Sequence, residues 1–436
     1  MKKTNLSIIA FLLLVMQSIA QPTGYFGLFS YNIASWLDNK KAAAAVTFDD
    51  GLNNQFDYAM SSLNARDISA TFFVVAGGGG YPVDWNKVRN ARANGHEIGA
   101  HSMVHIDLKN VHNYSVFFEE TFSAKTVIES EIPGYRVTTH AWASGGSNVS
   151  VRNTCSQYFI GARSASVGNT CYENYAPWTK ENYPLRIGAK QMNSAVTFDN
   201  LTNCTTSAIN ANGWMVLMFH AIETGGYANV SISTFNIFMD VLVNNKNQLW
   251  IAPFGDQSKY FQQRQNASLS VYYDNSQSVA FNYSLAFPHM YHAPVEWFDY
   301  PVTINIRKIP GTNYSAATQN GKSLSIVNHT DSISINIVPN AGAVVLTKQS
   351  VGIVDKMDDK NNIECFAFEN VLTIKSLQTF GGKLQIFALD GRQVFSKKLS
   401  NSNLYEFQLN LPPQLYLVKL TGTQFNFSAK VFVGRK

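Results

Sequence analysis

The segment Ala42–Gly51 reads AAAAVTFDDG, and it is the stretch that decides the fold of the first half of the chain. The apolar run Ala44–Phe48 predicts a buried strand, and two adjacent carboxylates, Asp49 and Asp50, follow directly at its end. Adjacent carboxylates at a buried strand end are costly unless a cation or a proton separates their charges. The segment therefore predicts a strand that carries one metal-binding carboxylate and one acid–base carboxylate. A simple Asp-Asp-Gly turn that closes the strand is the alternative.

Apolar runs alternate with helical patterns throughout residues 42–267. Between the first two runs, Phe56, Met60 and Leu63 recur at i, i+4 and i+7, which is one face of a helix. This alternation is typical of a parallel α/β fold, and about seven strands favour a distorted, incomplete (β/α) barrel over a flat sheet. The predicted strands are Ala44–Phe48, Ala70–Val75, Glu97–Ala100, Thr138–Ala143, Tyr158–Ala162, Met215–Phe219 and Leu249–Phe254.

The helical pattern ends after Ala267, and short alternating strands separated by turn residues replace it. Residues 268–350 therefore predict an accessory β-sandwich of the immunoglobulin-like kind. A polar stretch over residues 355–362 leads to a third, all-β unit at residues 372–436. In that unit the pair Asp390–Gly391 between two alternating runs predicts a tight β-hairpin. The expected architecture is an α/β barrel followed by two small sandwich-like β domains.

The composition indicates a foldable, exported chain. Of the 436 residues, 45% are hydrophobic and 14% are charged, and the net charge of +5 gives no signature of nucleic-acid binding. Residues 1–20 join two lysines, an apolar run and small residues, which is the pattern of a secretory signal peptide. No later segment is long and apolar enough to span a bilayer. We therefore expect a secreted or cell-surface protein, in which Cys155 pairs with Cys171.

Two histidine motifs join the carboxylates, each at the end of a predicted strand. HSMVH places His101 and His105 four residues apart, a spacing at which two imidazoles meet on one helical face and share a metal such as zinc. With Asp50 they form a set that leaves coordination positions open for water and substrate. LMFH ends in His220, which can protonate a leaving amine. Taken singly, each motif is equally typical of incidental loop or core histidines.

Taken in order, TFDDG, HSMVH and LMFH resemble the NodB-like polysaccharide deacetylases, a family of carbohydrate esterases. The resemblance covers about residues 42–267 and implies a hydrolase that removes acetyl groups from a polysaccharide. It implies that Asp50, His101 and His105 bind a divalent metal, usually zinc, which polarises the acetyl carbonyl. The other implied roles are general base for Asp49, general acid for His220, acetyl-methyl pocket for Leu217 and support of the metal-binding loop for Ser102.

The third motif departs from the family pattern. The strand end reads THAWASG over residues 139–145, with Trp142 and Ala143 where the family has tyrosine and proline. By resemblance, Trp142 lies at the substrate and the backbone N–H of Ser144 donates to the oxyanion.

The residues that orient the base and the acid stay open. The arginine that the family uses for the base is missing from the third motif; Arg163 or Arg136 could supply its charge, and the motif assigns neither. Asp199 and Glu223 are the nearest acidic residues in sequence that could orient His220.

The terminal unit, residues 372–436, resembles the C-terminal sorting domain of type IX secretion substrates. The matching features are LQIFALDGRQV, the strand LPPQLYLVKLTG and a basic tail. The resemblance implies secretion machinery as a partner; a plain β-sandwich accessory domain is the alternative. For the whole chain, two further functions stay open. One is hydrolysis of another non-peptide C–N bond on the same fold, and the other is non-catalytic carbohydrate binding at a surface.

Overall fold

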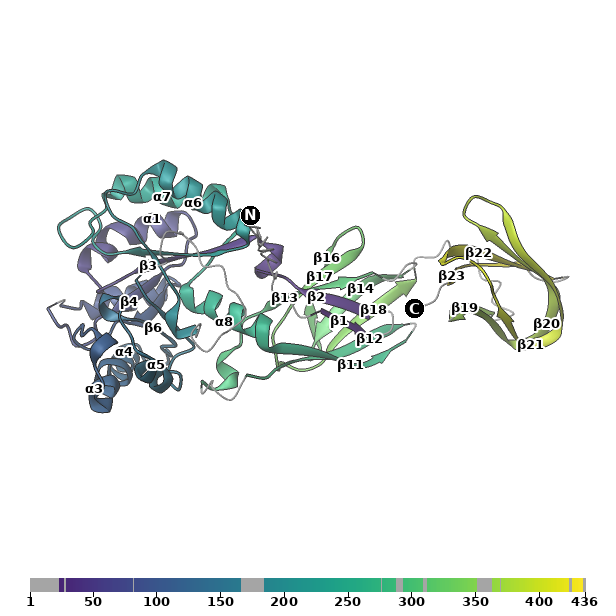
Figure 1. Cartoon of the computed structure of the whole chain (residues 1–436), viewed down its shortest axis with the longest axis horizontal. Coiled ribbons are helices and arrows are strands. Elements are labelled where there is room, and N and C mark those ends of the chain that lie inside the picture. The colour runs from purple at the N-terminus through teal and green to yellow at the C-terminus, as the bar shows by residue number, and fades with distance from the viewer. Residues whose placement is uncertain are drawn as a thin grey trace, which may run out of the picture. The chain divides into compact units, whose positions relative to one another are not determined.

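A computed structural model describes residues 23–26, 29–80, 82–165, 184–275, 277–287, 293–308, 312–350, 363–368, 370–422 and 426–433. The chain divides into two compact units (Figure 1). Unit 1 comprises Met1–Lys308 and Tyr314–Lys348, and unit 2 comprises Ile309–Asn313 and Gln349–Lys436. The predicted signal peptide and the polar stretch at 355–362 lie outside the described residues.

The first part of unit 1 is a curled sheet of parallel strands. The strand order is β7-β6-β5-β4-β3-β9-β8, with β10 paired to β3. Two residues between β7 and β9 pair with strands on opposite sides of this order. Ile187 forms a bridge with Arg163 of β7, and Lys190 of β8 pairs with Leu217 of β9. The predicted incomplete barrel is confirmed, and β8 is an addition to it. The strands are β3 (Ala42–Phe48), β4 (Thr71–Val74), β5 (Glu97–Ala100), β6 (Thr139–Ala141), β7 (Gly161–Arg163), β8 (Lys190–Gln191), β9 (Trp214–Phe219) and β10 (Leu249–Ile251).

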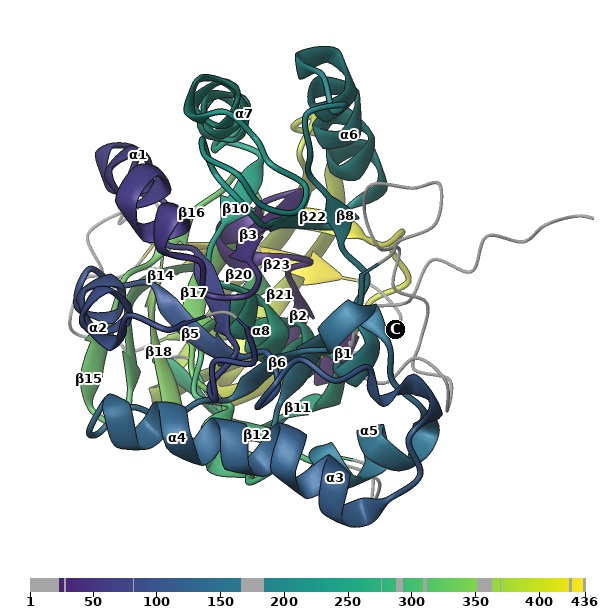
Figure 2. The ribbon, with the colours of Figure 1, turned by 90° about the vertical axis from the view of Figure 1, so that its left-hand side faces the viewer.

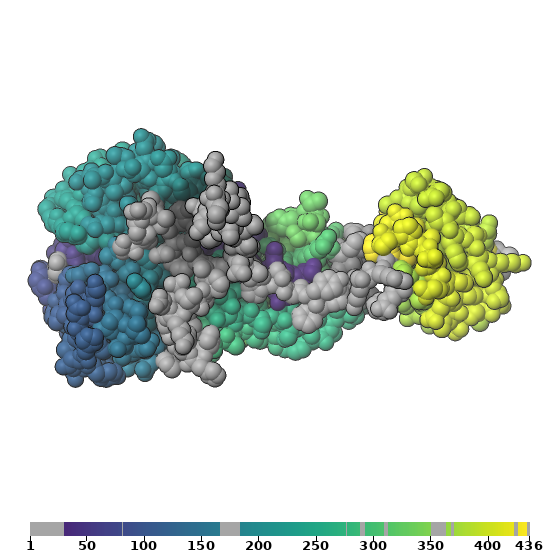
Figure 3. Space-filling model, viewed as in Figure 1, coloured from purple at the N-terminus to yellow at the C-terminus, as the bar shows by residue number. Residues whose placement is uncertain are grey.

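Helices pack around the outside of this sheet, as Figure 2 shows for α1, α2, α4, α6 and α7. In the space-filling view, α6 and α7 (teal) form one flank of the barrel and α3 to α5 (blue) another (Figure 3). The predicted face of Phe56, Met60 and Leu63 is buried, on a π-helical turn (η2, Gln55–Ala59) that continues into α1. The α-helices are α1 (Met60–Ala65), α2 (Trp85–Ala93), α3 (Tyr114–Phe118), α4 (Ala124–Glu131), α5 (Val149–Cys155), α6 (Phe198–Ala211), α7 (Ile232–Asn244) and α8 (Phe254–Asn266).

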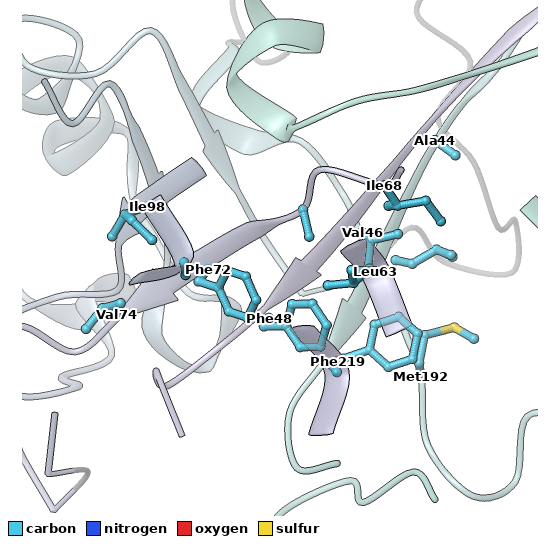
Figure 4. Packing of buried hydrophobic residues seen from close by; sticks show 14 of the residues in the cluster. Ala44, Val46, Phe48, Leu63, Ile68, Phe72, Val74, Ile98, Met192 and Phe219 are labelled. Atoms are coloured by element: carbon cyan, nitrogen blue, oxygen red, sulfur yellow. The ribbon is translucent and has the colours of Figure 1, made fainter. Parts of the chain in front are cut away.

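The alternation of side chains along β3 separates core from site. Ala44, Val46 and Phe48 belong to the core cluster that also contains the outer helices, whereas Ala43 and Ala45 belong to a second cluster with α8. In the outer cluster, Phe48 stacks on Phe72 at a centroid distance of 4.7 Å and lies 5.6 Å from Phe219 (Figure 4). Because side chains alternate with a period of two, Asp49 continues the inner face of the strand. The apolar row therefore anchors the strand end that carries the first carboxylate.

The second part of unit 1 is a β-sandwich, as predicted for residues 268–350, but it also recruits strands that precede the barrel. Its sheets have the orders β1-β2-β13-β17-β16 and β11-β12-β18-β14-β15. Their inner side chains share one buried cluster with Trp36, Trp214 and Tyr260 of the barrel region. The strands are β1 (Thr23–Phe26), β2 (Phe29–Ile33), β11 (Ala267–Asp274), β12 (Ser278–Leu285), β13 (Val302–Arg307), β14 (Thr312–Gln319), β15 (Lys322–Leu324), β16 (Val327–Asn328), β17 (Ser332–Ile337) and β18 (Val344–Ser350).

Unit 2 is a five-stranded antiparallel sheet with a core of its own. The predicted hairpin is present: β20 and β21 pair across a turn in which Gly391 has φ 84° and donates to the carbonyl of Ala388. The long strands of this hairpin shift register near Phe380, and the sheet has its own buried cluster. The strands are β19 (Glu364–Phe368), β20 (Val371–Ala388), β21 (Gln393–Gln408), β22 (Gln414–Thr421) and β23 (Asn426–Val433).

The disulfide prediction is wrong. Cys155 is a free thiol, fully buried at the end of α5, and burial raises its pKa to about 12. Cys204, on the buried face of α6, is disulfide-bonded instead. Cys171 lies outside the described residues. Among the residues that the structure describes, no helix has the length and apolar character needed to cross a membrane.

Candidate active site

The motif residues meet at the carboxyl ends of the parallel strands. Asp49 and Asp50 follow β3, His101 follows β5 and His220 follows β9. β9 pairs directly with β3, and β4 separates β3 from β5, so three motifs distant in sequence share one end of the barrel. Active sites of barrel enzymes are built at this end.

Several site residues have left-handed backbone conformations. The φ values are 74° for Asp50, 68° for Ser102, 65° for His105 and 53° for Ser144. Non-glycine residues seldom adopt these angles, and they persist where the surrounding structure holds them for a function. Gly51 follows with φ 71°, and a Cβ there would lie 3.1 Å from Val74, so only glycine fits this turn without displacement.

Asp50, His101 and His105 form a group able to hold a metal ion. One potential ligand atom from each lies within 4.8 Å of the others, and Oδ1 of Asp50 is 3.5 Å from Nε2 of both histidines. HSMVH is a loop and not the helical turn we expected; its left-handed residues bring the two rings to a centroid distance of 5.0 Å. The two histidines lie together as their spacing predicts, but a loop and not a helix brings them together.

The electrostatics of this group fit a cation. Oδ1 of Asp50 is buried without a hydrogen-bond partner among the described residues. Burial, reinforced by the neighbouring Asp49, raises the pKa of Asp50 to about 7. Burial lowers the pKa of His101 to about 4, which keeps its ring neutral as a ligand must be. A divalent cation bound here would stabilise the charged carboxylate of Asp50, and it would use the neutral ring of His101 as a ligand.

His101 is oriented by a backbone carbonyl. Its Nδ1 lies 2.8 Å from the oxygen of Ala141 on β6, so Nδ1 carries the proton and Nε2 presents its lone pair to Asp50. Metal-ligating histidines usually have such a partner on the second nitrogen.

Arg163 holds Asp49. Its Nη2 donates to both carboxylate oxygens of Asp49, and both side chains are buried. Burial by itself would raise the pKa of Asp49, but Arg163, helped by His101 and His220, outweighs it and lowers that pKa. The alternative, Arg136, lies 5.1 Å from the ring of Trp297 instead. The charge missing from the third motif is thus supplied from β7.

Nε2 of His220 lies 3.8 Å from Oδ2 of Asp49, and its side chain is only 10% exposed. Neither acidic candidate orients it: Asp199 is exposed in the first turn of α6, and Glu223 accepts from the backbone N–H of Ile232. Nδ1 of His220 has no hydrogen-bond partner among the described residues. Burial lowers the pKa of His220, opposed by Asp49.

Two polar side chains that the sequence analysis did not single out fix the site loops. Gln55 is fully buried, and its amide donates to the backbone carbonyls of Asp49 (2.5 Å) and His220 (3.1 Å). Glu120 is 1% exposed and accepts from the backbone N–H groups of Met103 and Val104, both at 3.1 Å. Each follows an unremarkable helical pattern, so its polar character at a buried position was the only available signal.

Ser102 contacts the loop in the way the resemblance implied. Its side chain is fully buried, and Oγ accepts a hydrogen bond of 2.7 Å from the backbone N–H of His105. This bond lies within the loop, whereas Glu120 connects the loop to the π-helical turn Glu119–Ser123.

The third-motif residues have different surroundings. Trp142, which the resemblance places at the substrate, is 1% exposed, and its indole N–H donates to the carbonyl of Leu185, so it is a core residue. Ser144 is exposed within the turn Ala143–Gly145 that follows β6. This turn lies between the strands that carry His101 and Arg163.

The structure does not place the side chain of Leu217 at the site. Leu217 is fully buried in the cluster that contains the outer helices, so its side chain faces away from the site. Met218 faces the inner side, where its sulfur accepts from Nη1 of Arg163 at 2.7 Å. The two-residue period counted back from His220 would have indicated Met218.

Comparison with known proteins finds similarity to one family in the first part of the chain. Residues 37–160 match the family model for polysaccharide deacetylase. This part of the chain is therefore similar to polysaccharide deacetylases, and the match covers less than half of the chain. The matched segment includes Asp49, Asp50, His101 and His105, and it ends before Arg163 and His220. The structure, and not the family match, brings Arg163 and His220 to Asp49.

Individual relatives are distant. The chain is 23% identical over 333 residues to a gellan lyase from Bacillus sp, covering 72% of this chain and 13% of that protein. A polysaccharide deacetylase structure from Bacillus cereus is 19% identical, with 38% of this chain and 50% of that chain covered and a TM-score of 0.32. A CE4 family pseudoenzyme from Bacillus anthracis is 16% identical, with 49% and 64% covered and a TM-score of 0.36.

Proposed function

We propose that this protein is a secreted, metal-dependent deacetylase of a polysaccharide that carries N-acetylglucosamine-type or O-acetylated sugars. The observation that carries the proposal is the buried Asp49–Arg163 pair beside the Asp50, His101 and His105 group. The family match supports the reaction class. A divalent cation, in our proposal zinc, would be held by these three side chains and would polarise the acetyl carbonyl as a Lewis acid.

Asp49 is the proposed general base. Arg163 occupies both of its oxygens and keeps it deprotonated, which a base must be before it can take a proton from the attacking water. The same pair fixes the direction of the carboxylate, because a buried guanidinium bound to both oxygens leaves little rotational freedom.

His220 is the proposed general acid. Its Nε2 lies 3.8 Å from Oδ2 of Asp49, the same distance as Nε2 of His101, and it can deliver a proton to the leaving nitrogen or oxygen of the sugar. We propose the backbone N–H of Ser144 as the oxyanion donor and Met218, in place of Leu217, as the side chain beside the acetyl methyl.

The proposal extends to location. We propose that residues 372–436 act as a sorting domain read by secretion machinery, which would place the enzyme at the cell surface or outside the cell. Two features support this: the hairpin at Asp390–Gly391 and a self-contained core without any of the proposed catalytic residues.

The decisive experiment measures acetate released from chitin oligomers, acetylated glucosamine polymer, peptidoglycan and acetylxylan, with and without a chelator. We expect acetate from at least one substrate, its loss with chelator, and its recovery when zinc is restored. Asp49→Asn serves as the control for non-enzymatic release.

Other outcomes would contradict the proposal. A product other than acetate from a small cyclic amide would indicate a different C–N hydrolase. Tight polymer binding without any hydrolysis by the metal-loaded protein would indicate a carbohydrate-binding protein on an enzyme scaffold.

A further inference from the structure

The loop after His220 is closely anchored. Ile222 and Val230 form a parallel bridge, and Val230 donates to the carbonyl of Ala221 at 3.0 Å. The side-chain amide of Asn54, next to the first motif, donates to the carbonyl of Thr224 at 2.8 Å. The tip of this loop is thus held in a fixed position relative to the proposed acid.

The tip of the loop presents Tyr227. The carbonyl of Tyr227 accepts from the backbone N–H of Ala221, and its side chain is 65% exposed. Its ring packs against His220 with centroids 4.9 Å apart and planes at 87°. Isolated exposed aromatics are common on protein surfaces. This one is different because it covers a side chain proposed to protonate the leaving group.

The proposed reaction requires a sugar ring of the substrate to approach His220. The atom that His220 would protonate is attached to the sugar ring that loses the acetyl group, so that ring must come near His220. The C–H faces of a pyranose are apolar, and an aromatic ring offers a flat apolar surface with few side-chain torsions to immobilise. The structure places such a surface within contact distance of the proposed acid.

We propose that Tyr227 is a saccharide-binding platform that stacks on a sugar ring of the polymer next to the scissile acetyl group. This inference rests on the proposed function and adds a recognition element that no motif of the chain specifies. Tyr227 binds the sugar and takes no part in proton transfer. Substrates that lack a sugar ring do not use it.

The test compares two substrates and three variants. The substrates are an N-acetylglucosamine pentamer and 4-nitrophenyl acetate, which has an acetyl group but no sugar. The variants are Tyr227→Ala, Tyr227→Phe and the control Tyr272→Ala, whose tyrosine is 59% exposed on β11 of the sandwich. Thermal melting of all variants verifies folding.

We expect Tyr227→Ala to raise KM for the pentamer on the order of tenfold, the loss typical of removing an aromatic anchor. Its kcat, and both constants for 4-nitrophenyl acetate, should stay within about twofold of the wild type. Tyr227→Phe should behave like the wild type, because the ring and not the hydroxyl does the stacking. An equal loss on both substrates would overturn the platform and show that Tyr227 acts through His220.

A direct measurement of pentamer binding tests the platform proposal separately from the deacetylase proposal. If the wild type binds the pentamer in calorimetry but releases no acetate, the deacetylase proposal fails, and loss of binding in Tyr227→Ala alone still supports the platform. If Tyr227→Ala binds the pentamer as tightly as the wild type, the platform proposal is wrong. It is also wrong if the wild type does not bind the pentamer.

Discussion

At the scale of single residues, the site combines backbone strain with unbalanced charge. Asp50, Ser102 and His105 hold left-handed angles, and Asp50 has a buried oxygen without a hydrogen-bond partner among the described residues. Features of this kind destabilise a fold by about 1–3 kcal/mol each unless they serve a ligand. Their concentration around one group is the physical argument for a cation.

His101→Ala should remove stoichiometric metal. The change deletes one of three ligands, and the remaining Asp50 and His105 cannot complete the group. Elemental analysis of the purified variant after dialysis against zinc measures the effect, with His112→Ala, an exposed histidine of the same region, as the matched control. Full occupancy in His101→Ala would refute the ligand assignment.

The paired aspartates should separate in their effects. Asp49→Asn should keep the metal and lower turnover on the order of a hundredfold or more, because a general base is lost while the ligands stay. Asp50→Asn should instead raise the dissociation constant for the metal, and its loss of turnover should follow from the loss of metal. Metal titration and kcat measured on both variants test this; equal loss of metal in both would show shared or reversed roles.

At the scale of elements, the sequence predicts the strands that carry the site residues but does not predict β8 or β2. Runs such as Ala44–Phe48 and Met215–Phe219 are buried on both faces and so are continuously apolar. β8 has two residues and β2 pairs with a strand far along the chain, so neither leaves a local pattern. Asp49, Asp50 and the histidines were found because they follow predictable strands.

Other site residues escaped prediction because tertiary contacts define them. Arg163 could be named only as one of two candidates, since its salt bridge joins strands at 114 residues' separation. Trp142 occupies a motif position, yet its hydrogen bond to Leu185 makes it part of the core. Gln55 and Glu120 act on backbone groups, which no residue pattern reveals.

The π-helical turn η4 (Glu119–Ser123) should support metal affinity through Glu120. In Glu120→Ala, two backbone N–H groups of the histidine loop, on the partly buried Met103 and the exposed Val104, lose their acceptor, at about 1 kcal/mol for each hydrogen bond. We expect a lower melting temperature and weaker zinc binding, measured by calorimetry. Glu119→Ala, an exposed neighbour on the same turn, should change neither; an unaltered melting temperature in Glu120→Ala would contradict the role.

The start of α8 should give stability a pH dependence. Burial, with the nearby Glu97, raises the pKa of Asp256 to about 7 in the folded state, above the value of an unfolded aspartate. The folded protein thus holds a proton that the unfolded chain releases, and this contribution to stability is lost as the pH rises from about 4 to 7.

Asp256→Asn mimics the protonated side chain and should remove this loss. Relative to the wild type, the variant should gain on the order of 1 kcal/mol in free energy of unfolding between pH 5 and pH 8, after a discount for partial solvent exposure. Urea unfolding at both pH values measures it. A difference that does not grow with pH would contradict the raised pKa.

At the scale of the whole molecule, the barrel and the sandwich belong together, whereas unit 2 has a core of its own. Trp36, Trp214 and Tyr260 share one cluster with the inner faces of both sandwich sheets. Unit 2 buries its own cluster and contains none of the proposed site residues. We therefore expect the proposed catalytic function and the proposed sorting function to be separable at the junction of the two units.

A chain that ends after Ser350 should fold, bind metal and release acetate within about twofold of the full chain, because its shared core is intact. In the native cell, our sorting proposal expects the same truncation to stay in the periplasm. A chain that ends after Ala267 should instead aggregate, since it exposes Trp250, Tyr260 and Phe261. A folded, metal-loaded but inactive product of the first truncation would contradict the separation of roles; its export to the surface would contradict the sorting proposal alone.

The early strand β2 has a consequence for how this protein is made. Ile33 of β2 pairs with Ile304 of β13, so roughly 270 residues must leave the ribosome between the two. At about 5–20 residues per second, β2 waits on the order of 15 to 50 seconds with one edge unpaired while the whole barrel emerges. During that time its exposed edge is open to wrong partners, including the same strand of a neighbouring nascent chain. Closure of the sandwich is then the final event of unit 1, and any agent that shields β2 until β13 arrives should raise the yield of active protein.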